Sequence, residues 1–243
     1  MIIKQILSYF ILISFYFISL GVNAQEKQKQ TDYNFNINAD FVSRYIWRGQ
    51  KLSETPAIQP GMSFSYKNLI IGTWASYSFG NEPIQEIDLF LSYQTGVFTF
   101  TLNDYFFLNN SLTDYVNYFD WNKNSTQHWL EAIVEISGIN NLPVNLLAGV
   151  FIAGADVDND INPQYSTYIE LSYDFKVKNI ENQIFAGFTP FKGYYSDAFD
   201  FVNIGFKTTK SIPITEKFSL PVSGALIINP ANRNIMFQAV ISI

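Results

Sequence analysis

A two-residue alternation of apolar and polar side chains is the feature that most constrains this chain. In the stretch YNFNINADF, residues 33–41, apolar side chains occupy every odd position and asparagine or aspartate every even position. An α-helix needs a period of 3.6 residues, whereas a period of two places successive side chains on opposite faces of a β-strand. The alternation recurs in residues 86–94, 97–104, 129–137, 168–175 and 235–243, so we expect an all-β fold.

Turn-forming residues divide the chain into twelve predicted strands. The strands are expected to begin near Tyr33, Ala57, Leu69, Gln85, Val97, Gln127, Pro143, Tyr165, Asn182, Phe199, Lys217 and Ile235. Their connections alternate between short turns and longer polar loops, and the longer set includes residues 46–56, 108–126, 154–164 and 191–198. Short turns at one end and long loops at the other are typical of outer-membrane barrels.

Composition separates two architectures that use alternating strands. A soluble sandwich or lipocalin-like barrel turns its apolar faces inward, whereas a membrane barrel turns them toward lipid. Aromatic residues make up 17% of the chain and charged residues only 15%, and the polar faces carry mainly Asn, Ser and Thr. That is too little charge for a soluble exterior. We therefore predict a transmembrane antiparallel up-and-down β-barrel.

The N-terminus predicts export. Lys4 precedes an apolar run, residues 6–20, and Val22-Asn23-Ala24 offers small residues at the −3 and −1 positions of a cleavage site. The alternative is an uncleaved membrane anchor, although the run is short for a span. We expect residues 1–24 to be a signal peptide, 25–32 a periplasmic polar tail and 33–243 the barrel, in the outer membrane of a Gram-negative bacterium.

Charge and cysteine content exclude several classes of partner. The net charge is −6, which argues against nucleic acid, because binding phosphates requires Lys and Arg. There is no cysteine, so neither a disulfide framework nor a thiolate metal site is available. We expect no cofactor. The expected partners are outer-membrane lipid, the barrel-assembly machinery and, if the lumen conducts, small solutes.

Whether a residue has an odd or an even position along its predicted strand, its parity, determines the face on which it lies. Parity therefore predicts which charged side chains line the lumen. They are Asp40, Arg44, Arg48, Glu86, Asp88, Glu131, Glu135, Glu170, Asp174 and Lys207. Acids outnumber bases seven to three in this set, so we expect a mildly cation-preferring pore, with Arg44 and Arg48 as a positive spot near the outer mouth. The alternative is an internal salt-bridge network that braces the barrel and conducts little.

Five aromatic residues fall on the same predicted face: Trp74, Phe90, Trp129, Phe185 and Phe201. They could form a stacking surface for a sugar or an aromatic solute. More simply, they fill or constrict the interior, because small barrels pack their lumens with side chains. A single β-bulge would reverse the parity of every residue beyond it.

Two further patterns bear on metal binding and catalysis. Asp156, Asp158 and Asp160 have the D-x-D-x-D spacing that opens calcium loops, but Ile161 stands where Gly is expected, which favours a solvated surface loop. His128 is the single histidine and shares a face with Leu130, so it is expected to face the lipid interface. Barrel lipases and acyltransferases generally use a histidine, yet no G-x-S-x-G elbow accompanies it, and we expect no enzyme.

The segment FVSRYIWRGQKLSETPAIQPGMSFSY, residues 41–66, resembles the opening of the TorF-like family of candidate outer-membrane porins. That family shows a strand, an aromatic-x-x-Arg-Gly loop and a second strand entered through Pro-Ala-x-Gln. The matching residues here are Tyr45, Arg48, Gly49, Pro56, Ala57 and Gln59. Residues 101–107, 165–173, 185–190 and 218–230 also look like the family. The chain departs from the usual aromatic C-terminal residue of outer-membrane strands, since it ends in Ile243.

The resemblance implies an outer-membrane barrel and, by its name, passage of small solutes. The predicted function is therefore passive diffusion through a porin. One alternative is a non-conducting structural or surface-binding barrel that acts through extracellular loops such as residues 109–126 and 154–164. A second is a lipid-modifying outer-membrane enzyme that depends on His128.

Overall fold

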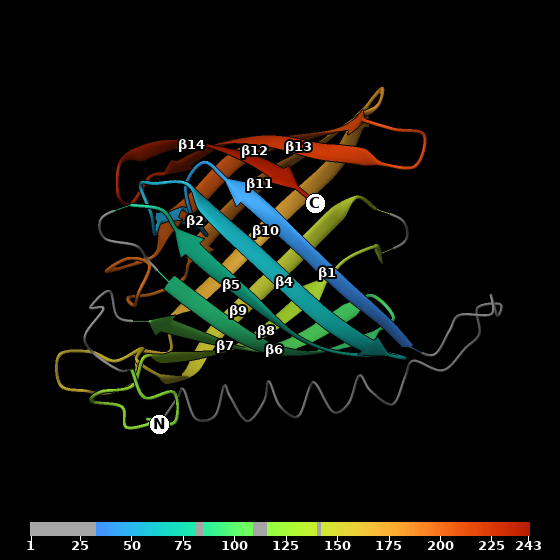
Figure 1. Ribbon diagram of the computed structural model, residues 1–243. Coiled ribbons are helices and arrows are strands. Elements are labelled where there is room, and N and C mark those ends of the chain that lie inside the picture. The colour runs from blue at the N-terminus through green and yellow to red at the C-terminus, as the bar shows by residue number, and fades with distance from the viewer. Residues whose placement is uncertain (1–32, 81–84, 109–115, 140–141) are drawn as a thin grey trace. The chain divides into compact units, whose positions relative to one another are not determined.

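Twelve antiparallel strands close on themselves to form a barrel, as the two-residue alternation predicts (Figure 1). The computed structural model describes residues 33–80, 85–108, 116–139 and 142–243. The predicted signal peptide and polar tail, residues 1–32, lie outside the described residues, as do residues 109–115 of the predicted long loop. In the described part of the chain, no helix is long and apolar enough to cross a membrane.

Every barrel strand begins within two residues of its predicted start. The strands are β1 (Tyr33–Val42), β4 (Ala57–Tyr66), β5 (Leu69–Ser78), β6 (Gln85–Thr95), β7 (Phe98–Leu108), β8 (His128–Ile136), β9 (Val144–Gly154), β10 (Thr167–Val177), β11 (Ile180–Thr189), β12 (Asp200–Pro213), β13 (Ser219–Asn229) and β14 (Asn234–Ser242). A short hairpin of β2 (Ile46–Trp47) and β3 (Gln50–Lys51) lies between β1 and β4, where the sequence predicted only a loop.

The connections differ in length at the two ends of the barrel. At the short-turn end, two residues join β4 to β5, β6 to β7 and β10 to β11. At the long-loop end, residues 43–56, 155–166 and 190–199 connect the strands, whereas residues 230–233 make a short turn. The strand β12 runs on to Pro213, and residues 214–218 connect it to β13 at the short-turn end.

The outer face of the barrel is apolar and exposed. Ile37 is 70% exposed, Phe237 60% and Leu171 54%. Their neighbours in sequence, Asn36 and Ser172, lie on the opposite face, because side chains alternate along each strand. Folding therefore leaves a broad hydrophobic surface outside, and closure leaves no sheet edge along most of the wall. Both are properties of an outer-membrane type of β-barrel.

A β-bulge in β12 corrects one predicted lumen residue. Gly187 pairs with Asn203 but Phe188 pairs with Phe201, so Val202 is the extra residue. Val202 is fully buried and Asn203 nearly so. Phe201 consequently lies with Phe188 at 5.9 Å between ring centroids and is 41% exposed. Its predicted place in the lumen is wrong, because the bulge reverses the parity between Phe201 and the rest of β12.

The barrel closes along the seam between β1 and β14. The pairing of β1 with β4 extends from Tyr33 to Val42, whereas β14 pairs only with residues Asp40 to Val42. Two backbone hydrogen bonds between Ala39 and Ile243, at 3.0 and 2.9 Å, extend this seam. The closure therefore depends on the half of β1 nearest the long-loop end.

Adjacent residues of β1 test the orientation of the faces. Ile37→Arg places a charge on the apolar outer face and is expected to destabilise the folded barrel in bilayers by about 2 to 4 kcal/mol. Asn36→Arg, one position earlier, points into the lumen and should be nearly neutral. Urea unfolding of both variants in lipid vesicles measures the difference. Equal destabilisation by the two substitutions would contradict the assigned faces.

Candidate functional site

The β2–β3 hairpin folds into the barrel and does not stand out from it. Ile46 packs against Ala225, Ile227 and Met236 of β13 and β14. Gly49, with φ +73°, lies so close to β12 that a Cβ there would come within 1.9 Å of the Val202 carbonyl oxygen. Only glycine fits this approach. We call residues 45–52, together with Tyr194 and Tyr195 of the loop at residues 190–199, the plug.

A buried ion pair joins the plug to the wall. The Arg48 guanidinium donates to both Glu131 carboxylate oxygens, Nη1 to Oε1 at 2.5 Å and Nη2 to Oε2 at 3.1 Å. Arg48 also donates to the Tyr195 hydroxyl at 2.8 Å, and the Tyr105 hydroxyl donates to Glu131 at 2.7 Å. The two charged side chains are 9% and 0% exposed. Arg48 is therefore not the exposed positive spot that parity predicted, because the hairpin carries it inward to a neutralising partner.

Aromatic rings complete the closure of the long-loop half of the lumen. The Arg48 guanidinium lies 4.6 Å from the ring centroid of Trp47 and 4.7 Å from that of Tyr168. Tyr105, Phe151, Tyr168, Tyr195 and Val202 form one buried cluster around them. The interior here corresponds to the alternative in which ion pairs and packed side chains brace the barrel.

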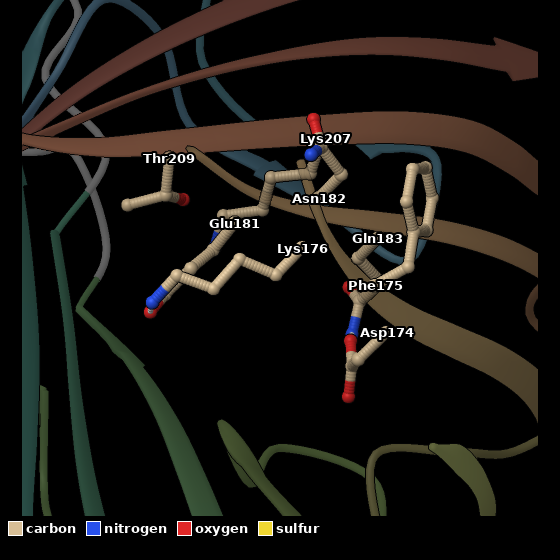
Figure 2. Close-up of a pocket in the computed structure, with 8 residues that line it drawn as sticks. All are labelled: Asp174, Phe175, Lys176, Glu181, Asn182, Gln183, Lys207 and Thr209. Atoms are coloured by element: carbon tan, nitrogen blue, oxygen red, sulfur yellow. Dashed lines mark hydrogen bonds and ion pairs between the residues drawn. The ribbon is translucent and has the colours of Figure 1, made fainter. Parts of the chain in front are cut away.

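The short-turn half of the lumen is polar and open. Figure 2 shows side chains of neighbouring strands β10, β11 and β12 around a pocket of about 530 Å³. The pocket is lined by Asp174, Phe175, Lys176, Glu181, Asn182, Gln183, Lys207 and Thr209. A second pocket, of about 340 Å³, includes Glu135 and Glu170. We call these two pockets the inner chamber, and four of the predicted lumen charges line it.

Most acids of the inner chamber are hydrogen-bonded. Asp174 accepts from Asn145 at 2.7 Å and from Gln183 at 2.8 Å. Glu170 accepts from the Asn203 amide at 2.8 Å and from the Tyr168 hydroxyl. In the described residues, neither Asp174 nor Glu170 has a salt-bridge partner. The chamber therefore keeps an acidic character that the buried Arg48–Glu131 pair lacks.

Glu86 and Asp88 form a buried acidic pair in the part of β6 nearest the long-loop end. They are 1% and 5% exposed, and their carboxyl groups are neighbours. The Tyr45 hydroxyl also bonds to Glu86. No Lys, Arg or His of the described residues lies within 4 Å of either carboxylate. One oxygen of each, Glu86 Oε2 and Asp88 Oδ1, has no hydrogen-bond partner in the described structure.

The remaining predicted lumen residues lie apart from one another. Asp40 pairs with Gln59 of β4 and, across the seam, with Ser242 of β14. Arg44 follows β1 at the long-loop end, 3.9 Å from Glu54 and 34% exposed. The other aromatic residues lie inside: Trp129 packs against the plug cluster, Trp74 contacts Tyr45, Phe90 covers Gly72 and Phe185 covers Gly205.

Two of the three aspartates at residues 156–160 accept hydrogen bonds from their own loop. Asp156 is buried and accepts from the Ser166 backbone N–H at 2.8 Å, and its burial raises the pKa of the carboxyl group. Asp158 accepts from the backbone N–H of Asn162 at 2.8 Å and of Asp160 at 2.9 Å, and the bond from Asn162 lowers its pKa. In the described part of the chain, no three acidic or histidine residues are grouped to hold a metal ion.

His128 lies on the outer face, as parity predicts, but a loop covers it. Its Nδ1 is 2.8 Å from Asp104 Oδ1 and its Nε2 is 2.6 Å from the Tyr118 carbonyl oxygen. Trp121 stacks on the ring at 3.9 Å. Both neighbours offer oxygen atoms that can accept a hydrogen bond from the ring. The ring is fully buried and does not meet lipid.

Among the residues of these clusters that sequence reasoning missed are Tyr195, Tyr105 and Asp104. Tyr105 has lumen parity, so the alternation along β7 could have placed it inside. Tyr194-Tyr195 is an aromatic pair within a Gly-, Ser- and Asp-containing loop, which is unusual for a solvated segment and could have indicated burial. Asp104 is a charge on an apolar face, and such a residue needs a partner.

The fold and the site together define an outer-membrane type of β-barrel with an internally plugged lumen. The chain belongs to a family described as bacterial protein of unknown function (Gcw_chp), whose model matches residues 26–219. No curated protein matches the chain. One similar solved structure is the outer membrane phospholipase A from Escherichia coli, 12% identical, with a TM-score of 0.35, covering 90% of this chain and 92% of that one.

The buried ion pair predicts how the plug is released. Glu131→Gln leaves the Arg48 charge buried without its partner, and breaking such a pair costs about 3 to 5 kcal/mol. We expect the hairpin to detach and Lys51 to become rapidly cleaved by trypsin in the folded barrel. The double variant Arg48→Met with Glu131→Leu replaces the pair by apolar groups and should stay resistant. Rapid cleavage of the double variant alone would contradict this role.

A double-mutant cycle tests the contact between Asp104 and His128. Each single change, Asp104→Asn or His128→Asn, should lower the free energy of unfolding, because it leaves the other group poorly paired beneath the loop. The two effects should be non-additive by about 0.5 to 3 kcal/mol. Urea unfolding in vesicles measures all four proteins. Strict additivity would show that the two residues act independently.

Proposed function

We propose that the protein is an outer-membrane porin of the TorF-like kind, in a Gram-negative bacterium, whose lumen is gated by the plug. Small solutes diffuse through it when the plug moves. The observation that carries the proposal is the Arg48–Glu131 pair, which holds a hairpin of only a few residues across the lumen above an open chamber. A wall-to-wall packed barrel would have no such chamber, and a general-diffusion pore would have no such plug.

The charge of the inner chamber supports a mild preference for cations. Glu135, Glu170 and Asp174 line it with Lys207 as their main opposite charge. Lys176, which also lines the chamber, is 3.5 Å from Glu181 and is largely neutralised. A passage lined by excess negative charge raises the local concentration of cations.

Two other roles are less well supported by the contacts. A non-conducting barrel acting through its loops is the second candidate, and the sealed long-loop half of the lumen favours it. A lipid-modifying enzyme would need His128 to take a proton from a nucleophile. Its Nε2 instead meets a backbone carbonyl, so we propose a structural role for this histidine.

Planar-bilayer recording of the refolded mature chain tests the gate. The wild type should show rare, small steps. Gly49→Ala introduces a Cβ that clashes with the Val202 backbone, and Glu131→Gln removes the ion pair of the hairpin. Both variants should raise the open probability of the channel at least about tenfold, which corresponds to about 1.4 kcal/mol. Glu216→Gln changes the same charge in an exposed turn and should match the wild type.

The reversal potential in a salt gradient gives the second result. Opened channels should be mildly selective for cations, because acidic side chains line the inner chamber. If both plug variants fold as heat-modifiable barrels and show no steps, the lumen does not conduct and the second candidate replaces this one.

A further inference from the structure

A separate pocket lies at the long-loop end, on the side of the plug away from the inner chamber. Its volume is about 260 Å³. Nine residues line it: Trp47, Leu52, Glu86, Tyr105, Phe107, Gln127, Trp129, Phe151 and Tyr194. Six of them are aromatic, and Glu86 is the only charged one among the described residues that line it. The volume lies below the range of about 300 to 1,000 Å³ for drug-sized ligands, so the fit is to a small molecule.

The rings of this pocket form a box. The Trp129 ring centroid is 5.2 Å from that of Tyr194 and 5.3 Å from that of Phe151, both near perpendicular. Trp47 and Tyr194 are 6.3 Å apart, at an interplanar angle of 57°. Rings at such angles present both faces and edges to the enclosed space. The faces carry negative potential and attract cations.

Glu86 gives the box its charge. It is 1% exposed and has one oxygen with no hydrogen-bond partner in the described structure. It touches a second acid, Asp88, and no base of the described chain lies within 4 Å of either. A buried carboxylate is costly unless it is paired, and ring faces beside it do not compensate it. A positive charge would satisfy the carboxylate and the rings together.

The plug contains the same combination of aromatic rings and a carboxylate, and there a residue of the chain supplies the cation. The Arg48 cation contacts the rings of Trp47 and Tyr168 and the carboxylate of Glu131. The pocket repeats this arrangement with Glu86 in place of Glu131, but the chain supplies no cation to it among the described residues. In the described part of the chain, no group of three acidic or histidine ligands is available for a metal ion. The arrangement suits an organic cation better than a metal.

We propose that this pocket binds a small organic ammonium ion, with Glu86 as its counter-charge and Trp47, Trp129 and Tyr194 as its aromatic walls. The binding does not depend on passage through the lumen, because the pocket lies on the long-loop side of the plug. A failure to bind the ammonium ion would therefore not contradict the proposed gate. A bilayer recording without conductance steps would likewise not contradict this binding site.

Calorimetric titration of the folded barrel in detergent tests the proposal, with choline chloride as the probe. Its neutral isostere, in which carbon replaces the ammonium nitrogen, is the matched ligand control. Choline should bind at least about tenfold more tightly than the isostere, the difference that one charge-assisted contact makes. Binding should also change the fluorescence of Trp47 and Trp129. Equal affinities, or tighter binding of glucose than of choline, would overturn the proposal.

Two variants locate the site. Glu86→Gln keeps the shape and removes the charge, so choline affinity should fall at least about tenfold while that of the isostere stays unchanged. Glu216→Gln removes one acid from a distant exposed turn and should leave both affinities as they are. Undiminished choline binding by a folded Glu86→Gln barrel would overturn the assignment. If that variant does not fold, the comparison of the two ligands on the wild type still decides.

Discussion

The closure of the sheet between β1 and β14 is the constraint on which the rest of the structure depends. A strand in hydrocarbon has no water to satisfy its N–H and C=O groups, so each must pair with a neighbouring strand. Closure supplies those pairs and at the same time defines an inside. Every later feature, from the apolar exterior to the acidic chamber, follows from which side of this closed wall a residue faces.

The interior then has to be filled or left wet, and this barrel does both. In the short-turn half, amides such as Asn145 and Gln183 hold carboxylates at a water-accessible surface. In the long-loop half, the hairpin brings an arginine to Glu131 and surrounds it with rings. The cost of burying two charges is offset by a bidentate contact and by two tyrosine hydroxyls.

The sequence predicted the wall much better than its contents. Alternation is a local property, so strand starts such as Tyr33, Ala57 and Leu69 could be placed to the residue. The bulge at Val202 shifts the phase of the alternation: apolar residues stand at 199 and 201 before it and at 202, 204 and 206 after it. A single odd–even rule applied through the whole strand therefore misplaces Phe201. The insertion of the hairpin depends on contacts far along the chain, such as Arg48 with Tyr195, that no local pattern contains. His128 was placed on the correct face, but its cover by Trp121 depends on how a loop folds back.

The reach of Arg48 along the sequence has a consequence for the order of folding. Its partners Glu131 and Tyr195 come 83 and 147 residues later in the chain. Strand hairpins form from neighbours and can appear early, whereas contacts of such long separation carry the largest loop-closure entropy and form late. The plug can therefore dock only after β8 and the loop beyond β11 are in place. Until then its arginine stays hydrated, and the burial of that one charge marks the completion of the barrel.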